Sequence, residues 1–280
     1  MKYTIEKNTV QETLVIPLYG RKKGSELYPT LYQDPMAIHL MDQIDYDFSN
    51  FEKSSHKLMI RFGFLEAVIR HNDMVIEVNN YLKKYPRAAV VNLGCGLDDL
   101  KDKVDNGQCT FYDLDFPDVI KIRQELLPPK ENERYIGCDL NDFSWMEKID
   151  GSEGAIFFAC GVFYYFLKEQ VHALILKLSQ TFKEGRIVFD AANKKAVRLM
   201  LKTWIKDAKI RDVNAYFSIS NAKKELSPLS EEIQVSSRGY MLGYHDLKDP
   251  SISRFFRFLA KIGDRYMKMQ IVGIDFKRSE

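Results

Sequence analysis

From Pro86 onward, short apolar runs alternate with longer segments that carry apolar residues at helical spacing. Five β-branched or aromatic runs are predicted to be strands: Ala88–Leu93, Cys109–Asp113, Arg134–Cys138, Ala155–Cys160 and Arg186–Asp190. Three segments between and after them are predicted to be crossover helices: Asp118–Leu127, Lys168–Thr181 and Lys194–Asp207. Continuous apolar strands separated by helices are typical of a parallel sheet that is covered on both faces. The pattern therefore predicts an α/β fold for residues 86–280.

The two ends of the chain show other patterns. Leu58, Phe62, Leu65 and Ile69 recur at helical spacing, and the pattern continues to Leu82. Residues 1–85 are therefore predicted to be a mainly helical segment that packs on the sheet as a lid. Since no linker, repeat or low-complexity tract divides the chain, we expect one domain over residues 1–280. The C-terminal elements are a short Gly239–Leu242 segment, a helix-like Ser251–Gly263 and a last strand at Met269–Phe276.

A tight glycine turn follows the first predicted strand. Gly94 and Gly96 flank Cys95, and neither glycine carries a Cβ that would keep the backbone away from a ligand. The next predicted strand ends in acid, and Asp115 lies nineteen residues after Gly96. A glycine turn with a carboxylate at the tip of the next strand is how α/β proteins hold an adenosine-like ribose. The alternative is a turn with a purely structural role.

The residues after the turn disfavour a dinucleotide. The dinucleotide fingerprint needs a third glycine at position 99, where this chain has Asp99. Asp98 and Asp99 are expected to open the following helix, where they would repel a bound phosphate. S-adenosylmethionine carries ribose and adenine but no phosphate, so the sequence favours it. A nicotinamide-dependent oxidoreductase is the less favoured alternative.

Composition narrows the class of protein further. Hydrophobic residues make up 45% and charged residues 29% of the 280 positions, which is ordinary for a soluble globular protein. The net charge of +2 does not indicate a nucleic-acid partner. No apolar run approaches the roughly eighteen residues of a membrane span, and the N-terminus does not resemble a signal peptide. The four dispersed cysteines indicate free thiols in a reducing cytoplasm, and the histidines show no metal-ligand spacing.

Several motifs, taken in order, give the chain a family resemblance. They are Pro17-Leu18 with Arg21, Asp34-Pro35 with Ala37, Arg70, Val90–Asp98, Tyr112–Pro117 with Val119-Ile120, Ser144-Trp145-Met146 and Gly161–Phe166. With them the sequence resembles the leucine carboxyl methyltransferase family, in the bacterial branch of tetracenomycin-type polyketide O-methyltransferases. The resemblance implies a class I methyltransferase, Rossmann-like sheet, mostly parallel and closed by an antiparallel hairpin. It also implies methyl transfer from S-adenosyl-L-methionine to a carboxylate or hydroxyl of a small acceptor, leaving S-adenosyl-L-homocysteine.

The resemblance also implies which residues bind the cofactor. The ribose acid of the family matches Asp115, with Asp113 as its competitor, and the arginine for the methionine carboxylate matches Arg70, with Arg61 as its rival. The full set that we expect at the cofactor is Arg70, Gly94, Cys95, Gly96, Asp115, Asp139, Leu140, Cys160 and Gly161. In this set the Asp139-Leu140 pair would hold the adenine.

The chain departs from the family pattern at two places. Asp99-Leu100 replaces the usual Thr-Arg, and Cys160 replaces the glutamate that receives the amino group of the cofactor. A neutral thiol cannot balance an ammonium group, so a backbone carbonyl or another acid must do so. These departures keep open the alternative of a homologue that binds S-adenosylmethionine without catalysis.

The acceptor is expected over the carboxyl ends of the later strands, where ligands of open α/β sheets collect. Candidate substrate-binding residues there are Tyr164, Tyr165, Arg238 and Tyr240. An inward Arg238 would select a carboxylate-bearing acceptor, although a surface role is also open. His245 is the candidate general base, with a structural hydrogen-bonded histidine as the alternative. A carboxylate acceptor would need no base, because it is already ionised at neutral pH.

Overall fold

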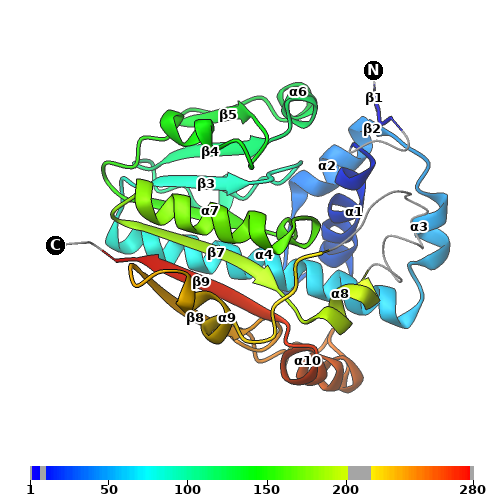
Figure 1. Cartoon of the computed structure of the whole chain (residues 1–280). Helices are drawn as coiled ribbons and strands as arrows, with labels where there is room; N and C mark the ends of the chain where they lie inside the picture. The colour runs from blue at the N-terminus through cyan, green and yellow to red at the C-terminus, as the bar shows by residue number, and fades with distance from the viewer. Residues whose placement is uncertain (1, 7–10, 201–215, 278–280) are drawn as a thin grey trace.

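A seven-stranded sheet forms the centre of the protein (Figure 1). The computed structural model describes residues 2–6, 11–200 and 216–277. Along the sheet the order is β5 (Glu133–Gly137), β4 (Thr110–Asp115), β3 (Ala89–Leu93), β6 (Ala155–Ala159), β7 (Gly185–Ala191), β9 (Gln270–Phe276) and β8 (Ile233–Gly239). β9 runs antiparallel to both of its neighbours, whereas the other pairs are parallel. The prediction of a mostly parallel sheet closed by an antiparallel hairpin is confirmed.

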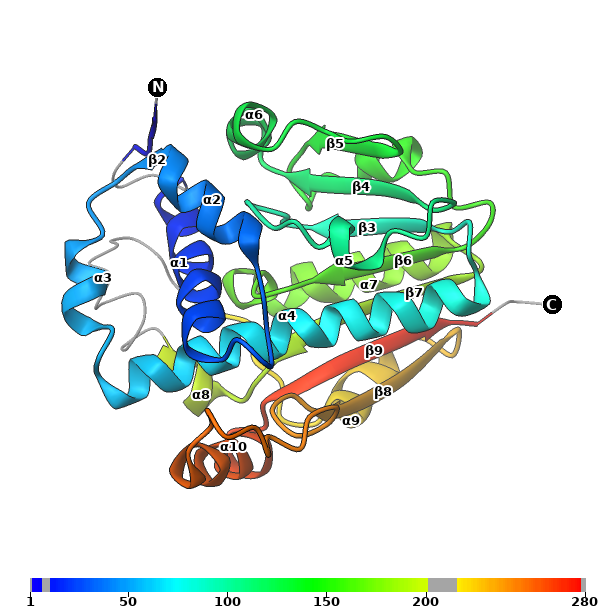
Figure 2. The ribbon, with the colours of Figure 1, turned by 180° about the vertical axis from the view of Figure 1, so that it is seen from behind.

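Both faces of the sheet are covered, because successive side chains of a strand point to opposite faces. Val90 packs in the core on the side of α4 (Leu58–Lys84), whereas Val91 packs in the core on the side of α7 (Lys168–Thr181). Figures 1 and 2 show these two helices on opposite sides of the strands. This double burial is why the strands read as continuous apolar runs.

The N-terminal region is helical, as its periodicity predicts. α1 (Glu12–Leu27) packs against α4 and α2 (Pro35–Gln43), and α3 (Ser49–Ser54) follows a two-stranded sheet of β1 (Tyr3–Thr4) and β2 (Ile44–Asp45). Figure 2 shows the carboxyl ends of the central strands pointing toward α1 and α2. These helices therefore stand at the edge of the sheet where ligands of α/β proteins bind.

The remaining elements are short or lie near the C-terminus. They are α5 (Lys101–Val104), α6 (Pro117–Leu126), η1 (Phe143–Lys148), η2 (Phe163–Tyr165), α8 (Lys194–Met200), α9 (Ala222–Leu226), η4 (Ser227–Leu229) and α10 (Arg254–Tyr266). The helix predicted over Lys194–Asp207 is present to Met200, and its remainder lies outside the described residues. In the described ranges, no helix is both long enough and apolar enough to cross a membrane.

Candidate functional site

The glycine turn after β3 is fixed by the carboxylate at the end of β4. Gly94 and Gly96 have φ angles of 72° and 50°, which favour glycine. Oδ2 of Asp115 accepts the backbone N–H of Gly96 at 2.8 Å, and Oδ1 accepts the N–H of Phe116 at 2.8 Å. Burial raises the pKa of Asp115, while these two N–H donors lower it. Each oxygen keeps a second lone pair, so Asp115 can still accept hydrogen bonds from a ligand.

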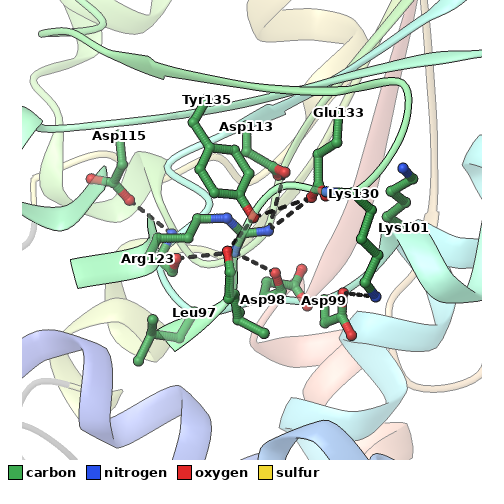
Figure 3. A network of polar contacts seen from close by, with 12 residues as sticks. Leu97, Asp98, Asp99, Lys101, Asp113, Asp115, Arg123, Lys130, Glu133 and Tyr135 are labelled. Atoms are coloured by element: carbon green, nitrogen blue, oxygen red, sulfur yellow. Dashed lines mark hydrogen bonds and ion pairs between the residues drawn. The ribbon is translucent and has the colours of Figure 1, made fainter. Parts of the chain in front are cut away.

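The competing acid, Asp113, points into the protein interior instead. Its Oδ2 lies 3.1 Å from Nη2 of Arg123, and both side chains are buried (Figure 3). Oε1 of Glu133 lies 3.5 Å from the same Nη2 atom. Asp113 is therefore engaged in an internal ion pair, and Asp115 is the carboxylate at the turn.

Arg123, on α6, also holds the glycine turn from beneath. Its Nη1 donates to the carbonyl oxygens of Gly96 at 3.2 Å and Asp98 at 2.5 Å. The side chain is 1% exposed, so the protein interior fixes these bonds in place. Sequence reasoning missed Arg123, because nothing in a helical segment marks one arginine as inward.

The expectation for Asp98 and Asp99 was wrong in two respects. Asp98 and Asp99 do not open the helix after the turn, because α5 begins only at Lys101 and is a single turn. Asp98 is buried, with Oδ1 2.8 Å from Nε2 of His71 and 3.3 Å from Nη1 of Arg21. Burial alone would raise the pKa of Asp98, but His71 and Arg21 hold it well below its ordinary value. The guanidinium of Arg21 thus offsets the charge of Asp98, so repulsion of a phosphate by Asp98 is a weaker argument than the sequence indicated.

At the ends of β6 and β7, Arg70 meets an acid that sequence reasoning did not find. Nη1 of Arg70 lies 3.2 Å from Oδ2 of Asp190, and Oδ1 of Asp190 accepts the N–H of Gly161 at 2.6 Å. Gly161 has a φ of 77°, and a Cβ there would lie 3.0 Å from Nη1 of Arg70. Burial raises the pKa of the neighbouring Cys160 thiol to about 12, so it stays neutral. The rival arginine, Arg61, is exposed.

A cavity of about 270 Å³ adjoins this group, as bounded by the described residues. Its walls are mostly apolar and come from α1, α4, α8 and α10, with Ile16, Phe62, Met200 and Leu259 among them. The polar side chains on its wall are Glu66, Arg70, Cys160, Tyr164, Tyr165 and Tyr240. An apolar cavity with a few convergent polar groups is the usual form of a small-molecule site.

The residues that were predicted to bind the methyl acceptor lie in two separate places. Tyr164, Tyr165 and Tyr240 line the cavity. Arg238 does not, because its guanidinium pairs with Glu77 and lies over the ring of Tyr244. These three residues line a separate polar hollow on the α4 side of β7 and β9. Arg238 is therefore placed away from the position that was expected for it.

His245 also lies away from the cavity. Its Nε2 is 2.8 Å from Oδ1 of Asp73, a fully buried residue of α4. Burial raises the pKa of Asp73 to about 6, although the hydrogen bond from His245 lowers it. This contact matches the alternative of a structural hydrogen-bonded histidine, since it ties the segment after β8 to α4.

The Asp139-Leu140 pair follows β5, next to the tip of β4. Oδ1 of the exposed Asp139 accepts the backbone and side-chain N–H groups of Asn141, both at 2.9 Å. Leu140 is buried in the core on the α7 side, and its carbonyl accepts the indole N–H of Trp145. The pair thus lies at the same edge of the sheet as Asp115.

Together these groups fit S-adenosylmethionine. A positive-φ glycine turn and Asp115 suit a ribose, and the Nε atom of Arg70 is buried without a partner among the described residues. A dinucleotide suits the turn less well, because Asp99 stands where the dinucleotide fingerprint has its third glycine. Within the described ranges, no group of His, Cys, Asp and Glu is placed to hold a metal ion.

Comparison with known proteins points to the same chemistry. The model of the leucine carboxyl methyltransferase family matches residues 21–179, which is more than half of the chain. The tetracenomycin polyketide synthesis O-methyltransferase TcmP of Streptomyces glaucescens is 27% identical over 192 residues, covering 68% of this chain and 69% of that protein. The S-adenosyl-L-methionine-dependent methyltransferase dpfgK of Gibberella zeae is 22% identical over 235 residues, covering 77% and 78%. The solved structure of a DUF574 family protein from Streptomyces avermitilis shares the fold, with a TM-score of 0.63, 11% identity and coverage of 95% and 97%.

Proposed function

Because the chain belongs to the leucine carboxyl methyltransferase family and uses S-adenosylmethionine as cofactor, we propose that it methylates an oxygen atom of a small, largely apolar acceptor. The observation that carries this proposal is the apolar cavity beside Arg70 and Gly161. The similarity to TcmP, an O-methyltransferase of polyketide synthesis, supports a polyketide-like acceptor.

In this proposal the residues that would hold the cofactor stand at the carboxyl ends of β4, β3 and β6. The turn from Gly94 to Gly96 lets the ligand approach the backbone, and Asp115 accepts hydrogen bonds from the ribose hydroxyls. Asp139 accepts from the adenine amino group, and Leu140 packs near the ring. Arg70 binds the methionine carboxylate, because a guanidinium can donate two parallel hydrogen bonds to it.

Asp190 takes the place of the glutamate that Cys160 replaces. Cys160 directly follows β6 and Asp190 lies near the end of the neighbouring β7, where Ala159 pairs with Phe189. The two oxygens of Asp190 accept from Gly161 and Arg70, which leaves lone pairs for the ammonium group of the cofactor. A buried carboxylate balances that charge, which the neutral Cys160 cannot do.

The chain supplies mainly alignment and exclusion of water. When bound, the cofactor provides an electrophilic methyl group on a sulfonium. Alignment of the two reacting groups is worth roughly 7–11 kcal/mol of the barrier. The apolar wall contributed by α1 and α4 orients the acceptor. Because these helices belong to residues 1–85, we propose that this segment covers the site and forms one domain with the sheet.

A methyl-transfer assay tests this function. The protein would be incubated with S-adenosylmethionine that carries a radiolabelled methyl group and with a panel of aromatic phenols and acids. We expect label in the organic phase, and alkaline hydrolysis would release it from esters but not from ethers. S-adenosylhomocysteine binding without transfer to any acceptor would instead support a non-catalytic binding protein.

A further inference from the structure

We propose that the exposed face of α10 docks on the headgroup region of an anionic lipid bilayer. This inference goes beyond the proposed methyl transfer and does not depend on it. Figures 1 and 2 show α10 on the outside of the fold, at the opposite end of the molecule from α6. Its inner side is formed by the buried residues Phe256, Ala260 and Gly263. A helix that lies on a bilayer does not cross it, so docking of this kind needs no membrane-spanning segment.

The outer half of α10 carries an apolar stripe. The residues at successive spacings of four, three and four positions lie along one line of the helix, and they are Phe255, Leu259, Ile262 and Tyr266. Phe255 and Tyr266 are 46% and 64% exposed, and Phe258 beside them is 58% exposed. Leu259 and Ile262 line the apolar cavity, so the stripe continues from the surface onto the cavity wall. Large apolar side chains that gather on one exposed face mark an interaction surface.

A cationic stripe runs beside the apolar one. Arg254, Lys261 and Arg265 follow one another at spacings of seven and four positions, and all three are exposed. Within the ranges that the structure describes, none of the three has an ion-pair partner. The single acid of α10, Asp264, accepts the backbone N–H groups that follow Tyr240, so its carboxylate is engaged by the protein. The exposed face is therefore positively charged, although the whole chain carries a net charge of only +2.

The start of α4 extends this surface. Phe62 of α4 contacts Phe256 of α10, with ring centroids 5.6 Å apart. Met59 is exposed and lines the cavity together with Leu259. The exposed residues of this turn of α4 include Leu58, Met59 and Arg61. Apolar and cationic side chains are thus exposed on two neighbouring elements that also form the cavity wall.

An anionic bilayer fits this face better than two other occupants. A second copy in a twofold dimer would bring the cations of both copies into one interface, because such an interface joins the same face twice. An acidic protein would pair with the cations, but it would also need a matching surface for three exposed rings. At a bilayer, aromatic side chains enter the boundary of the acyl chains while arginine and lysine stay at the anionic headgroups.

Docking in this way would place the cavity next to the lipid phase. Leu259 and Ile262 belong both to the apolar stripe and to the cavity wall, so lipid in contact with the stripe borders the cavity. Under the proposed function, which this consequence alone assumes, an acceptor dissolved in the bilayer reaches the site without crossing water.

Co-sedimentation with vesicles tests the docking surface. Vesicles of phosphatidylcholine with about 30% phosphatidylglycerol would be compared with vesicles of phosphatidylcholine alone, at about 0.1 M salt. We expect the natural protein to partition about tenfold or more strongly onto the anionic vesicles. Most of this binding should be lost at about 0.5 M salt, because salt screens the attraction between exposed charges.

Two variants of α10 separate the two stripes. Arg254→Gln, Lys261→Gln and Arg265→Gln combined should weaken binding to the anionic vesicles roughly 100-fold, at about fivefold for each cation. Phe255→Ser combined with Phe258→Ser should weaken it about tenfold or more, because the rings no longer enter the acyl boundary. Unchanged midpoints of urea unfolding would show that both variants are folded.

A matched control removes the same charge elsewhere. Lys121, Lys177 and Lys183 are exposed on or directly after α6 and α7. Replacing all three by Gln should weaken vesicle binding by less than about threefold, because these positions lie far from the bilayer. Loss of binding in both α10 variants, but not in this control, would support the proposal.

Other results would overturn it. The docking surface is wrong if the natural protein ignores anionic vesicles, if the control loses as much binding as the cation variant, or if both α10 variants bind normally. Self-association that the phenylalanine variant abolishes would show that this face joins two copies. Equally strong binding of poly-L-glutamate, with no loss in the phenylalanine variant, would show that it takes an acidic chain. None of these measurements needs cofactor or acceptor, so the proposed methyl transfer is tested separately by S-adenosylhomocysteine binding.

Discussion

The guanidinium of Arg123 lies 3.1 Å from the carboxylate of Asp113 and also donates to the backbone of the glycine turn. One buried side chain therefore links α6, β4 and the predicted ribose site. This arrangement also explains why Asp113, although it lies on the strand that carries Asp115, points into the protein interior.

Replacing Arg123 tests this link. Arg123→Met should lower the free energy of unfolding by about 3–5 kcal/mol, because it leaves Asp113 and Glu133 buried without their cation. Urea unfolding would measure the loss. Arg134→Met, at an exposed arginine of β5, should stay within about 0.5 kcal/mol of the natural protein. Equal stabilities of the two variants would show that the buried pair does not stabilise the fold.

If Asp190 binds the ammonium group of the cofactor in place of the glutamate that Cys160 replaces, its loss should weaken only ligands that carry this group. Asp190→Asn should weaken S-adenosylhomocysteine about tenfold or more, because the ammonium group loses its charged acceptor. Binding of 5′-methylthioadenosine, which lacks the amino-acid end, should change less than about twofold. Calorimetry with both ligands measures the difference. An equal loss for both would mean that Asp190 acts by shaping the loop at Gly161.

The buried Asp98 predicts an acid-dependent part of stability. His71 and Arg21 depress its pKa in the folded protein, so folding favours its ionised form. This contribution is complete above the unfolded pKa of about 3.9 and is lost as pH falls toward the folded value. The free energy of unfolding should therefore fall more steeply below about pH 4 in the natural protein than in Asp98→Asn. Parallel acid slopes in urea unfolding would contradict this account.

The sequence predicted the sheet well, because strands that are buried on both faces consist almost entirely of apolar residues. β3, β6 and β7 read as apolar runs, and the two glycines marked the turn between β3 and the residues that follow. β8 was largely missed. It is an edge strand with one partner, and its exposed serines and terminal Arg238-Gly239 broke the apolar pattern.

The site was harder to predict, because it depends on which side chains meet across the fold. Arg70 could be identified from a motif. Asp190, by contrast, has no sequence feature that distinguishes it from other acids near strand ends, and its partner Arg70 is 120 positions away in the sequence. Glu66 is one acid within an amphipathic helix, and only the cavity distinguishes it. Arg238 and His245 looked free, but Glu77 and Asp73 on α4 engage them.

The most direct test of the account is calorimetric titration of the purified protein and of Asp115→Asn with S-adenosylhomocysteine, with NAD as the comparison ligand. We expect one micromolar site for S-adenosylhomocysteine and none for NAD. The variant should bind roughly 10- to 100-fold more weakly, since it loses charge-assisted hydrogen bonds to the ribose, while Asp118→Asn, at an exposed acid of α6, should bind normally. Absence of binding by the natural protein, or unchanged affinity in Asp115→Asn, would contradict the account.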